Sequence, residues 1–425
     1  MALPGRLVAT LVTTVSLTLL GAVGTTLPAH AAPQRTAEAE TAPHRPLWTG
    51  TWATAPSHAV PALPGTSIRN VVHTSVGGHA ARIRVTNRLG TAPLRIGALT
   101  VALQTPGAPR SPAAVPGSLR PATFRGAASV TVPPGRDLLS DPVRLRVPAA
   151  ANLLVTLYTP EDSGPATQHR SALQTNFLAR GADHTADETG TPYTLTTTSW
   201  HYLAGVDVAG SGARGSVVAL GDSITDGSGS TSGANRRWPD RLAARLHALP
   251  PHRRLGVLNA GIAGNRLLLD GTGPSVLARF DADVLSRAGV RAVIVMIGIN
   301  DIKGTPAQTD PAAFTDAYRS LVARAHDRGV RVIGGTIAPY AGHSGYTEAR
   351  EAVRQSVNRF IRDGEVFDGV ADFDAAVRDP GQPNRILPAY DPGDHLHFND
   401  AGLQAMADAV DLAGLGVRTP QGAGR

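Results

Sequence analysis

The chain of 425 residues exceeds the roughly 250 residues at which a single hydrophobic core stops growing, so two domains are expected. It contains no cysteine, which excludes disulfide bonds, thiolate zinc sites and cysteine nucleophiles. Its formal net charge of +7 comes mainly from arginines spread along the chain, and no basic stretch is interleaved with aromatic residues, so no nucleic-acid partner is expected.

Residues 1–31 have the order of a secretory signal peptide. Arg6 precedes an apolar run over residues 7–23, and a small-residue sequence predicts cleavage after Ala31. A retained membrane anchor is the alternative, but the run contains several threonines and barely reaches spanning length. Residues 32–45 are polar and small, which predicts a disordered leader. We therefore expect a secreted protein with no stable membrane span after cleavage.

Residues 46–208 show the period-two alternation of a β-rich domain. Apolar residues alternate with arginines in segments 81–86 and 143–147, as they do in half-buried strands. Proline and glycine clusters break these runs, and no long amphipathic helix is predicted. The pattern indicates an antiparallel β-sandwich of jelly-roll type.

Residues 209–215 are predicted to form a linker between the domains. They contain a G-x-G-x-x-G sequence, but it precedes a predicted strand, whereas a dinucleotide-binding loop follows one. Other familiar signatures, namely G-x-S-x-G, H-E-x-x-H, the Walker A loop and S-x-x-K, are absent from the sequence. The chemistry must therefore be sought in less common patterns.

Residues 216–415 alternate between short apolar strands and helical stretches, and residues 416–425 are predicted to be a disordered tail. The predicted strands cover residues 217–220, 256–258, 290–297, 330–334 and 366–370. The predicted helices cover residues 239–249, 276–286, 312–328, 347–362 and 400–412. The alternation predicts a parallel sheet with helices on both faces. Active sites of such sheets lie beyond the carboxyl ends of the strands.

A Gly-Asp-Ser sequence follows the first of these strands directly and places Ser223 in a loop at the carboxyl edge of the sheet. Its hydroxyl could face a cleft there, as a nucleophile requires. A polar turn that caps a helix is the alternative. Taken alone, the stretch does not decide between the two.

Two further stretches follow the second and third strands. The glycines of residues 259–265 allow positive φ and close backbone approach, which a main-chain donor to an oxyanion needs, although turn glycines are the simpler explanation. Asn300 follows the most apolar strand, and its amide could donate a hydrogen bond into the same cleft. A turn cap formed with Asp301 is the alternative there.

The last stretch with chemical potential precedes the final predicted helix. Asp394 and His397 are three residues apart, so one loop can supply a base and the carboxylate that orients it. A serine hydroxyl needs such a base, because it is a poor nucleophile until its proton is taken. A metal site is the alternative, since two histidines and two aspartates fall in this short stretch, but it leaves Ser223 without a purpose.

Together the four stretches resemble the sequence blocks of the SGNH, or GDSL-type, hydrolases. Ser223 in Gly-Asp-Ser-Ile matches the first block, with Ile224 in place of the usual leucine, and Gly264 matches the second. Asn300 in Gly-x-Asn-Asp matches the third, and Asp394 with His397 matches the D-x-x-H of the last. The β-rich half is also similar, more loosely, to the domain that precedes the hydrolase in some exported actinobacterial members.

The resemblance implies a flavodoxin-like three-layer α/β/α domain that hydrolyses carboxylic esters without metal or cofactor. It implies the catalytic residues Ser223, Asp394 and His397 and a supporting role for Asp222. His395 is then not the base, because it breaks the three-residue spacing. The oxyanion hole would consist of the N–H groups of Ser223 and Gly264 and the Asn300 amide.

The substrate stays open between acylated polysaccharides, short-chain lipid esters and aryl esters. Trp48, Trp52 and Trp200 are candidates for sugar stacking in the β-rich domain, and burial in its core is the alternative. A different hypothesis is a carbohydrate-binding or adhesion protein that keeps a hydrolase-like domain without turnover. The complete set of Ser223, Asn300, Asp394 and His397 counts against that hypothesis.

Overall fold

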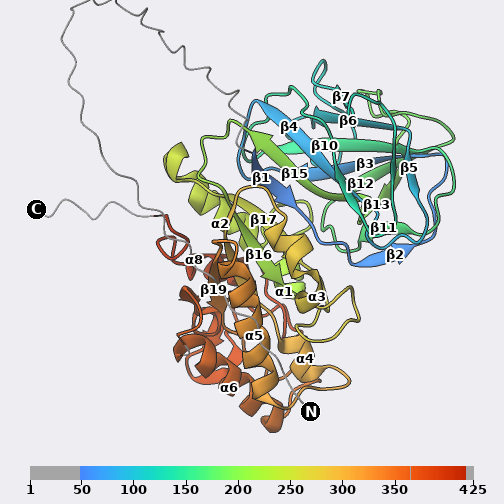
Figure 1. Ribbon diagram of the computed structural model, residues 1–425. Coiled ribbons are helices and arrows are strands. Elements are labelled where there is room, and N and C mark those ends of the chain that lie inside the picture. Colours follow the sequence, from blue (N-terminus) through green and yellow to red (C-terminus); the bar gives the residue numbers. More distant parts are fainter. Residues whose placement is uncertain (1–47, 364, 418–425) are drawn as a thin grey trace, which may run out of the picture. The chain divides into compact units, whose positions relative to one another are not determined.

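The computed structural model describes residues 48–363 and 365–417 (Figure 1). The predicted signal peptide, the predicted leader and most of the predicted tail lie outside these residues. Within the described ranges, no helix combines the length and the apolar character needed to cross a bilayer. The antiparallel and parallel parts of the chain belong to one compact unit.

The antiparallel part consists of three sheets and a strand pair. The first sheet has the order β1 (Trp48–Ala53), β15 (Leu203–Ala209), β4 (Ala80–Thr86), β9 (Asp137–Leu139). The second has the order β13 (Leu195–Thr197), β12 (Asn176–Arg180), β3 (Thr66–His73), β10 (Asn152–Thr159), β6 (Ala98–Leu103), β7 (Arg120–Ala122). The third has the order β14 (Trp200–His201), β11 (Ala166–His169), β2 (His58–Val60), and β5 (Leu94–Ile96) pairs with β8 (Val130–Val132).

One buried apolar cluster joins the first two sheets of this part. Ile83 of β4 belongs to the same cluster as Ile68 of β3 and Val155 of β10, and all three side chains are inaccessible to solvent. Two antiparallel sheets that share a core form a sandwich. The predicted antiparallel sandwich is thereby confirmed.

One of the two segments on which that prediction rested is not a strand. Residues 81–86 lie in β4 and alternate as expected, with apolar side chains buried. Residues 143–147 keep the in-and-out alternation but form only two isolated bridges, Ala81 with Val143 and Gly78 with Val147. The reason is local, because β9 already pairs with the end of β4 and the prolines at positions 142 and 148 lack N–H donors.

The tryptophans of this part support the core. Trp52 and Trp200 are buried and meet edge to face with ring centroids 5.0 Å apart, and the Trp200 Nε1–H donates to the Val71 carbonyl at 2.8 Å. Trp48 is partly buried, with the Arg82 guanidinium 4.6 Å from its ring centre. These contacts favour the core role that the sequence left as an alternative to sugar stacking.

The C-terminal part contains a five-stranded parallel sheet, as predicted. Its order is β17 (Gly256–Gly261), β16 (Ser216–Gly221), β18 (Val290–Met296), β19 (Arg331–Gly335), β20 (Gly369–Ala371). In chain order this is 2-1-3-4-5, the flavodoxin-like arrangement. The last strand begins at Gly369, later than predicted, because the Asp368 carboxylate accepts the Val332 N–H at 2.7 Å and occupies that ladder position.

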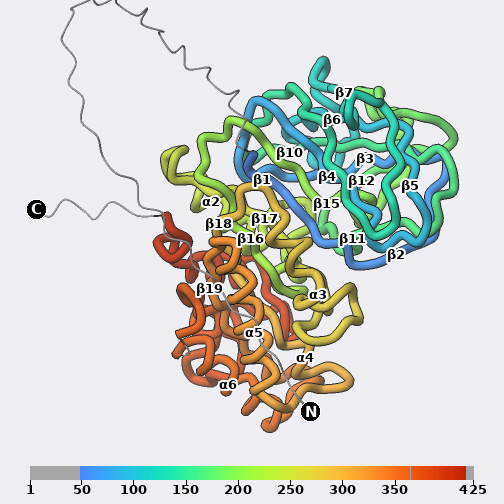
Figure 2. The backbone as a smooth tube through the Cα atoms, viewed as in Figure 1, coloured from blue at the N-terminus to red at the C-terminus, as the bar shows by residue number. Residues whose placement is uncertain are grey.

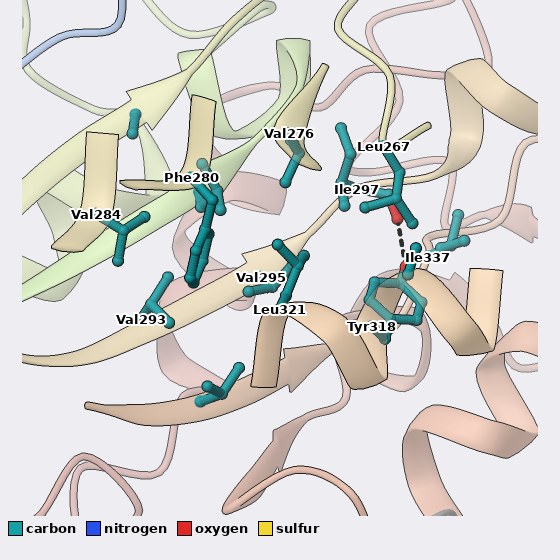
Figure 3. Packing of buried hydrophobic residues seen from close by; sticks show 14 of the residues in the cluster. Leu267, Val276, Phe280, Val284, Val293, Val295, Ile297, Tyr318, Leu321 and Ile337 are labelled. Atoms are coloured by element: carbon teal, nitrogen blue, oxygen red, sulfur yellow. Dashed lines mark hydrogen bonds between the residues drawn. The ribbon is translucent and has the colours of Figure 1, made fainter. Parts of the chain in front are cut away.

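Helices cover both faces of this sheet, and each face has its own cluster of buried apolar side chains. Alternate residues of β16 belong to one cluster or the other. Val218 and Leu220 pack with α3 (Val276–Phe280), α5 (Pro311–His326) and α6 (Glu348–Asp363), and Figure 3 shows part of this cluster. Val217 and Ala219 pack with α2 (Trp238–His247), α7 (Phe373–Val377) and α8 (Asp400–Asp408). The shorter elements are α1 (Ser223–Asp226), η1 (Pro251–Arg253), η2 (Asp281–Leu285), α4 (Ile299–Lys303), β21 (Arg378–Asp379) and β22 (Gln382–Ile386).

The two parts are joined tightly where β1 lies beside β17 (Figure 2). A Cβ atom on Gly256 would lie 2.0 Å from the Gly50 carbonyl oxygen, so the two backbones touch. Nearby, Arg88 of the antiparallel part binds the buried Asp283 at 2.7 Å. These contacts fix the antiparallel part against the parallel part. The antiparallel part can therefore affect the position of residues near the edge strand β17.

Candidate active site

Ser223 lies at the point where β16 ends and α1 begins. The chain turns sharply there, since a Cβ atom on Gly221 would lie 2.3 Å from Thr225 Oγ1 of the helix that follows. Asp222 caps α1 by accepting the Ile224 N–H at 3.1 Å, and Ser223 is the first residue of the helix. The first N–H groups of a helix have no partner within it, so the Ser223 N–H can serve another acceptor.

His397 connects Ser223 to Asp394. The His397 Nε2 atom lies 2.9 Å from Ser223 Oγ, and Nδ1 lies 2.6 Å from Asp394 Oδ2. A carboxylate only accepts hydrogen bonds, so Nδ1 carries the proton and the Nε2 lone pair faces the serine hydroxyl. The structure thus brings together the three residues predicted to be catalytic, over a separation of 174 residues between Ser223 and His397.

Asp394 is held in its ionised form by the turn that contains it. Burial would raise its pKa, but the N–H groups of His397 and Leu396 donate to Asp394 Oδ1 at 2.9 Å and 3.0 Å. Together with the His397 ring they outweigh burial and lower the pKa of Asp394 below its ordinary value. The carboxylate therefore remains an acceptor for Nδ1–H at neutral pH.

His395 belongs to a separate pair. Its Nδ1 atom lies 2.5 Å from Asp391 Oδ2, and its backbone adopts a positive φ of 59°. That conformation places His395 against Gly342, away from the contact that His397 makes with Ser223. Each histidine is bonded to its own aspartate, and no group of three metal-ligating side chains occurs in the described ranges.

The loop after β17 lies between α1 and α4 and carries Gly264. Gly264 is exposed, has a φ of 81°, and its N–H donates to no group within residues 48–363 and 365–417. Asn300 is buried at the start of α4, and its Nδ2 donates one hydrogen bond to the Asn265 carbonyl at 2.9 Å. That bond fixes the Asn300 amide beside Asn265, the neighbour of Gly264. An oxyanion donor needs such a fixed position.

Three residues that were not predicted to support the site hold this loop in place. Asp301 accepts the N–H groups of Leu267 and Leu268 at 2.7 Å and 3.0 Å. Arg279 is 3% exposed and donates to the Gly221 carbonyl at 3.0 Å and to Asn265 Oδ1 at 3.1 Å. The third, Asp226, accepts the N–H of residue 263 at 3.0 Å. The one signal in the sequence was Arg279, a charged residue among the apolar residues of α3. It does not indicate which groups the guanidinium binds.

Among the predicted site residues, Asp222 is the one whose pKa is changed most by its surroundings. Burial raises the pKa of Asp222 to about 6, although the Ile224 N–H and the nearby His397 and Lys303 side chains oppose that rise. Asp222 is 1% exposed, and Lys303, the only lysine of the chain, lies in α4. An ionised Asp222 is therefore costly for the folded state.

Asp222→Asn should consequently raise the melting temperature at pH 8 and have little effect at pH 4. The folded pKa exceeds the unfolded value of about 3.9, so the folded state binds the extra proton and stability falls as the pH rises from about 4 to about 6. Removal of the charge recovers at most about 3 kcal/mol above that window, while the amide oxygen still caps α1. Thermal unfolding at both pH values measures the effect, and a lower melting temperature at pH 8 would contradict it.

Part of the chain is similar to known proteins. Residues 219–405 match the model of the GDSL-like lipase/acylhydrolase family. No curated protein sequence matches the chain. Similar solved structures include an α/β hydrolase from the metagenome of Lake Arreo, 27% identical over 48% of this chain and 97% of that one, with a TM-score of 0.37.

Two further solved structures are similar to parts of the chain. A GDSL-like lipase from Bacteroides thetaiotaomicron is 19% identical, covers 45% of this chain and 84% of its own, and has a TM-score of 0.35. A family two carbohydrate esterase from Cellvibrio japonicus is 12% identical, covers 86% of this chain and 93% of its own, and also has a TM-score of 0.35.

Proposed function

The chain belongs, through residues 219–405, to the GDSL-like lipase/acylhydrolase family of SGNH hydrolases, and from that premise we propose that it is an exported serine esterase that forms an acyl-enzyme on Ser223. Carboxylic ester hydrolysis follows from the family. The observation that carries the assignment to Ser223 is the unbroken path of hydrogen bonds from Ser223 through His397 to Asp394.

In the proposed reaction His397 acts first as a base and then as an acid. Its Nε2 takes the Ser223 proton as Oγ attacks the ester carbonyl carbon, and the resulting imidazolium then protonates the departing alcohol. Water repeats the sequence on the acyl-enzyme and releases the carboxylic acid and free Ser223. Asp394, whose pKa is lowered, stays ionised and stabilises the imidazolium.

The negative oxygen of the tetrahedral intermediate needs donors that are in place before it forms. The N–H groups of Ser223 and Gly264 are free in the described ranges, and the Asn300 amide keeps one hydrogen after binding the Asn265 carbonyl. Donors fixed in advance stabilise the transition state without reorganisation. This arrangement supports an oxyanion hole made by these three residues.

Asn300→Ala should mainly lower kcat, by about 10²-fold to 10³-fold, because loss of one oxyanion donor weakens the transition state more than the bound ester. Steady-state kinetics with p-nitrophenyl acetate measures the effect. Asn384→Ala, which removes an amide bonded to the Tyr346 hydroxyl at 3.1 Å, is the matched control and should leave kcat within about twofold. An effect on KM alone would move Asn300 from the oxyanion hole to substrate binding.

We propose short acyl groups on a polysaccharide as the substrate. The Asp394 side chain is 48% exposed and the His397 side chain 22% exposed, so the base lies at an open surface that a bulky alcohol can approach. Such an open site accepts the alcohol part of the ester without having to enclose the rest of the polymer. Secretion after cleavage behind Ala31, predicted from the sequence, would bring the enzyme to such a substrate.

The substrate proposal is tested with p-nitrophenyl esters of increasing acyl length and with acetylated xylan. We expect kcat/KM to be highest for acetate and to fall with chain length, and we expect xylan to release acetate. A preference for long acyl chains would point to lipid esters. Protein recovered from the culture medium with a mature N-terminus at Ala32 would support export.

A further inference from the structure

His169 of β11 is buried between the two parts of the molecule and makes a hydrogen bond with each ring nitrogen. Nδ1 lies 2.8 Å from the Ala55 carbonyl oxygen, and Nε2 lies 2.9 Å from Asp226 Oδ1. Carbonyl and carboxylate oxygens only accept hydrogen bonds, so both nitrogens must donate. Both contacts exist together only when the ring is an imidazolium.

The surroundings of His169 fit that charge state. The ring is 2% exposed and lies 5.5 Å from the Trp200 ring. Burial by itself would lower the pKa of His169, and the Arg237 charge acts in the same direction, but Asp226 outweighs both and raises the pKa above its ordinary value. The antiparallel part thus presents a fixed donor to the parallel part of the chain.

Asp226 passes this contact on to the loop that carries Gly264. It is the last residue of α1, which begins at Ser223, and its other carboxylate oxygen accepts the Ala263 N–H at 3.0 Å. The backbone of Asp226 also packs on Gly261, where a Cβ atom would lie 2.2 Å from the Asp226 nitrogen. One carboxylate therefore ties the nucleophile's helix, the loop and His169 together.

The other end of the loop is fixed from within the parallel part. Asp301 holds the N–H groups of Leu267 and Leu268, and Asn300 holds the Asn265 carbonyl. On the side that precedes Gly264, the Ala263 N–H donates to Asp226. The antiparallel part reaches this side of the loop through the contact of His169 with Asp226.

We propose that His169 is a positioning residue for ester hydrolysis: its Nε2–H holds Asp226, and Asp226 holds the loop so that the Gly264 N–H points at the developing oxyanion. This inference rests on the proposed function. The antiparallel part is then required for full turnover, because it completes the support of the oxyanion hole. A donor displaced by a fraction of an ångström loses much of its effect on the transition state.

A pair of amide substitutions at His169 separates positioning from packing. Glutamine places an amide N–H near the position of Nε2 and can still donate to Asp226, whereas asparagine places its amide near Nδ1 and reaches only the Ala55 carbonyl. Both remove the same charge. We expect His169→Asn to lower kcat for p-nitrophenyl acetate by about tenfold to 100-fold with KM within about twofold, and His169→Gln to keep kcat within about fivefold of the parent.

His201→Gln is the matched control. His201 is a buried histidine of the neighbouring strand β14, and its ring is hydrogen-bonded to no group of α1. Its substitution should lower the melting temperature and leave kcat within about twofold. Circular dichroism and the melting temperature of each variant confirm that it is folded before its kinetics are compared.

Equal kcat for His169→Gln and His169→Asn, or a loss of kcat in the His201 control as large as that in His169→Asn, would overturn the inference. If His169→Asn does not fold, Asp226→Asn replaces it, because an amide cannot accept from both His169 and the Ala263 N–H. That variant should show the same loss in kcat, and full activity in it would equally refute the inference. Ser223→Ala, measured alongside, tests the proposed function separately. Full activity of this variant would refute the assignment of Ser223 as the nucleophile, whatever the His169 variants show.

Discussion

Replacement of Ser223 by alanine is expected to lower kcat for p-nitrophenyl acetate by a factor on the order of 10⁴ or more. The substitution removes the oxygen that lies 2.9 Å from His397 Nε2, and within 48–363 and 365–417 no other hydroxyl is hydrogen-bonded to that nitrogen. The alanine side chain fits the same buried position, so the fold should persist. Steady-state and pre-steady-state kinetics measure the loss of turnover and of the acyl-enzyme burst.

Ser228→Ala is the control for this substitution. Ser228 lies in the loop after α1, where its backbone N–H donates to the Ser223 carbonyl at 2.9 Å, and its side chain is partly buried. Loss of its hydroxyl should leave kcat within about twofold. Turnover that survives Ser223→Ala and is lost in Ser228→Ala would refute the assignment of the nucleophile.

Replacement of His397 by alanine is expected to cost as much as the loss of Ser223. Members of a catalytic triad act as a unit, so removal of the base leaves only the contribution of the oxyanion hole and of substrate binding. His395→Ala is the matched control in the same loop, because His395 is bonded to Asp391 and makes no contact with Ser223. We expect it to keep kcat within about threefold, which kinetics with p-nitrophenyl acetate will show.

The opposite outcome, a large loss in His395→Ala and a small one in His397→Ala, would mean that the three-residue spacing from Asp394 does not identify the base. The hydrogen bonds argue against that result. The Asp394 turn binds the backbone and the ring of His397 at once, whereas His395 is directed toward Asp391 by its positive φ of 59°.

Much of the site could be predicted because its residues lie in, or directly after, short sequence patterns. Apolar runs such as residues 217–220 predict buried strands, and Ser223 and Asn300 come directly after such runs. Since parallel strands end at one edge of a sheet, adjacency in sequence to a strand end becomes proximity in space. Asp394 and His397 are close in sequence as well, so their pairing needed no knowledge of the fold.

Residues 143–147 show why a local pattern was not sufficient elsewhere. Their alternation is correct, and Val143, Leu145 and Val147 are buried, but a strand also needs a free edge with which to pair. Whether β4 has a free edge depends on its pairing with β9. The alternation of residues 143–147 contains no information about that pairing. Periodicity reports which side chains face the core, and ladder pairing depends on neighbours far along the chain.

The sequence by itself determined the two-part architecture, the parallel sheet and the residues that come together at Ser223. The tertiary structure decided what holds those residues in place: Arg279 against the Gly221 carbonyl, Asp301 against the loop, and His169 of the antiparallel part against Asp226. These are hydrogen bonds of buried charged groups, and their partners are set by long-range packing that excludes water around them. No spacing or periodicity encodes such partners, because the two groups meet only after the strands and helices between them have packed.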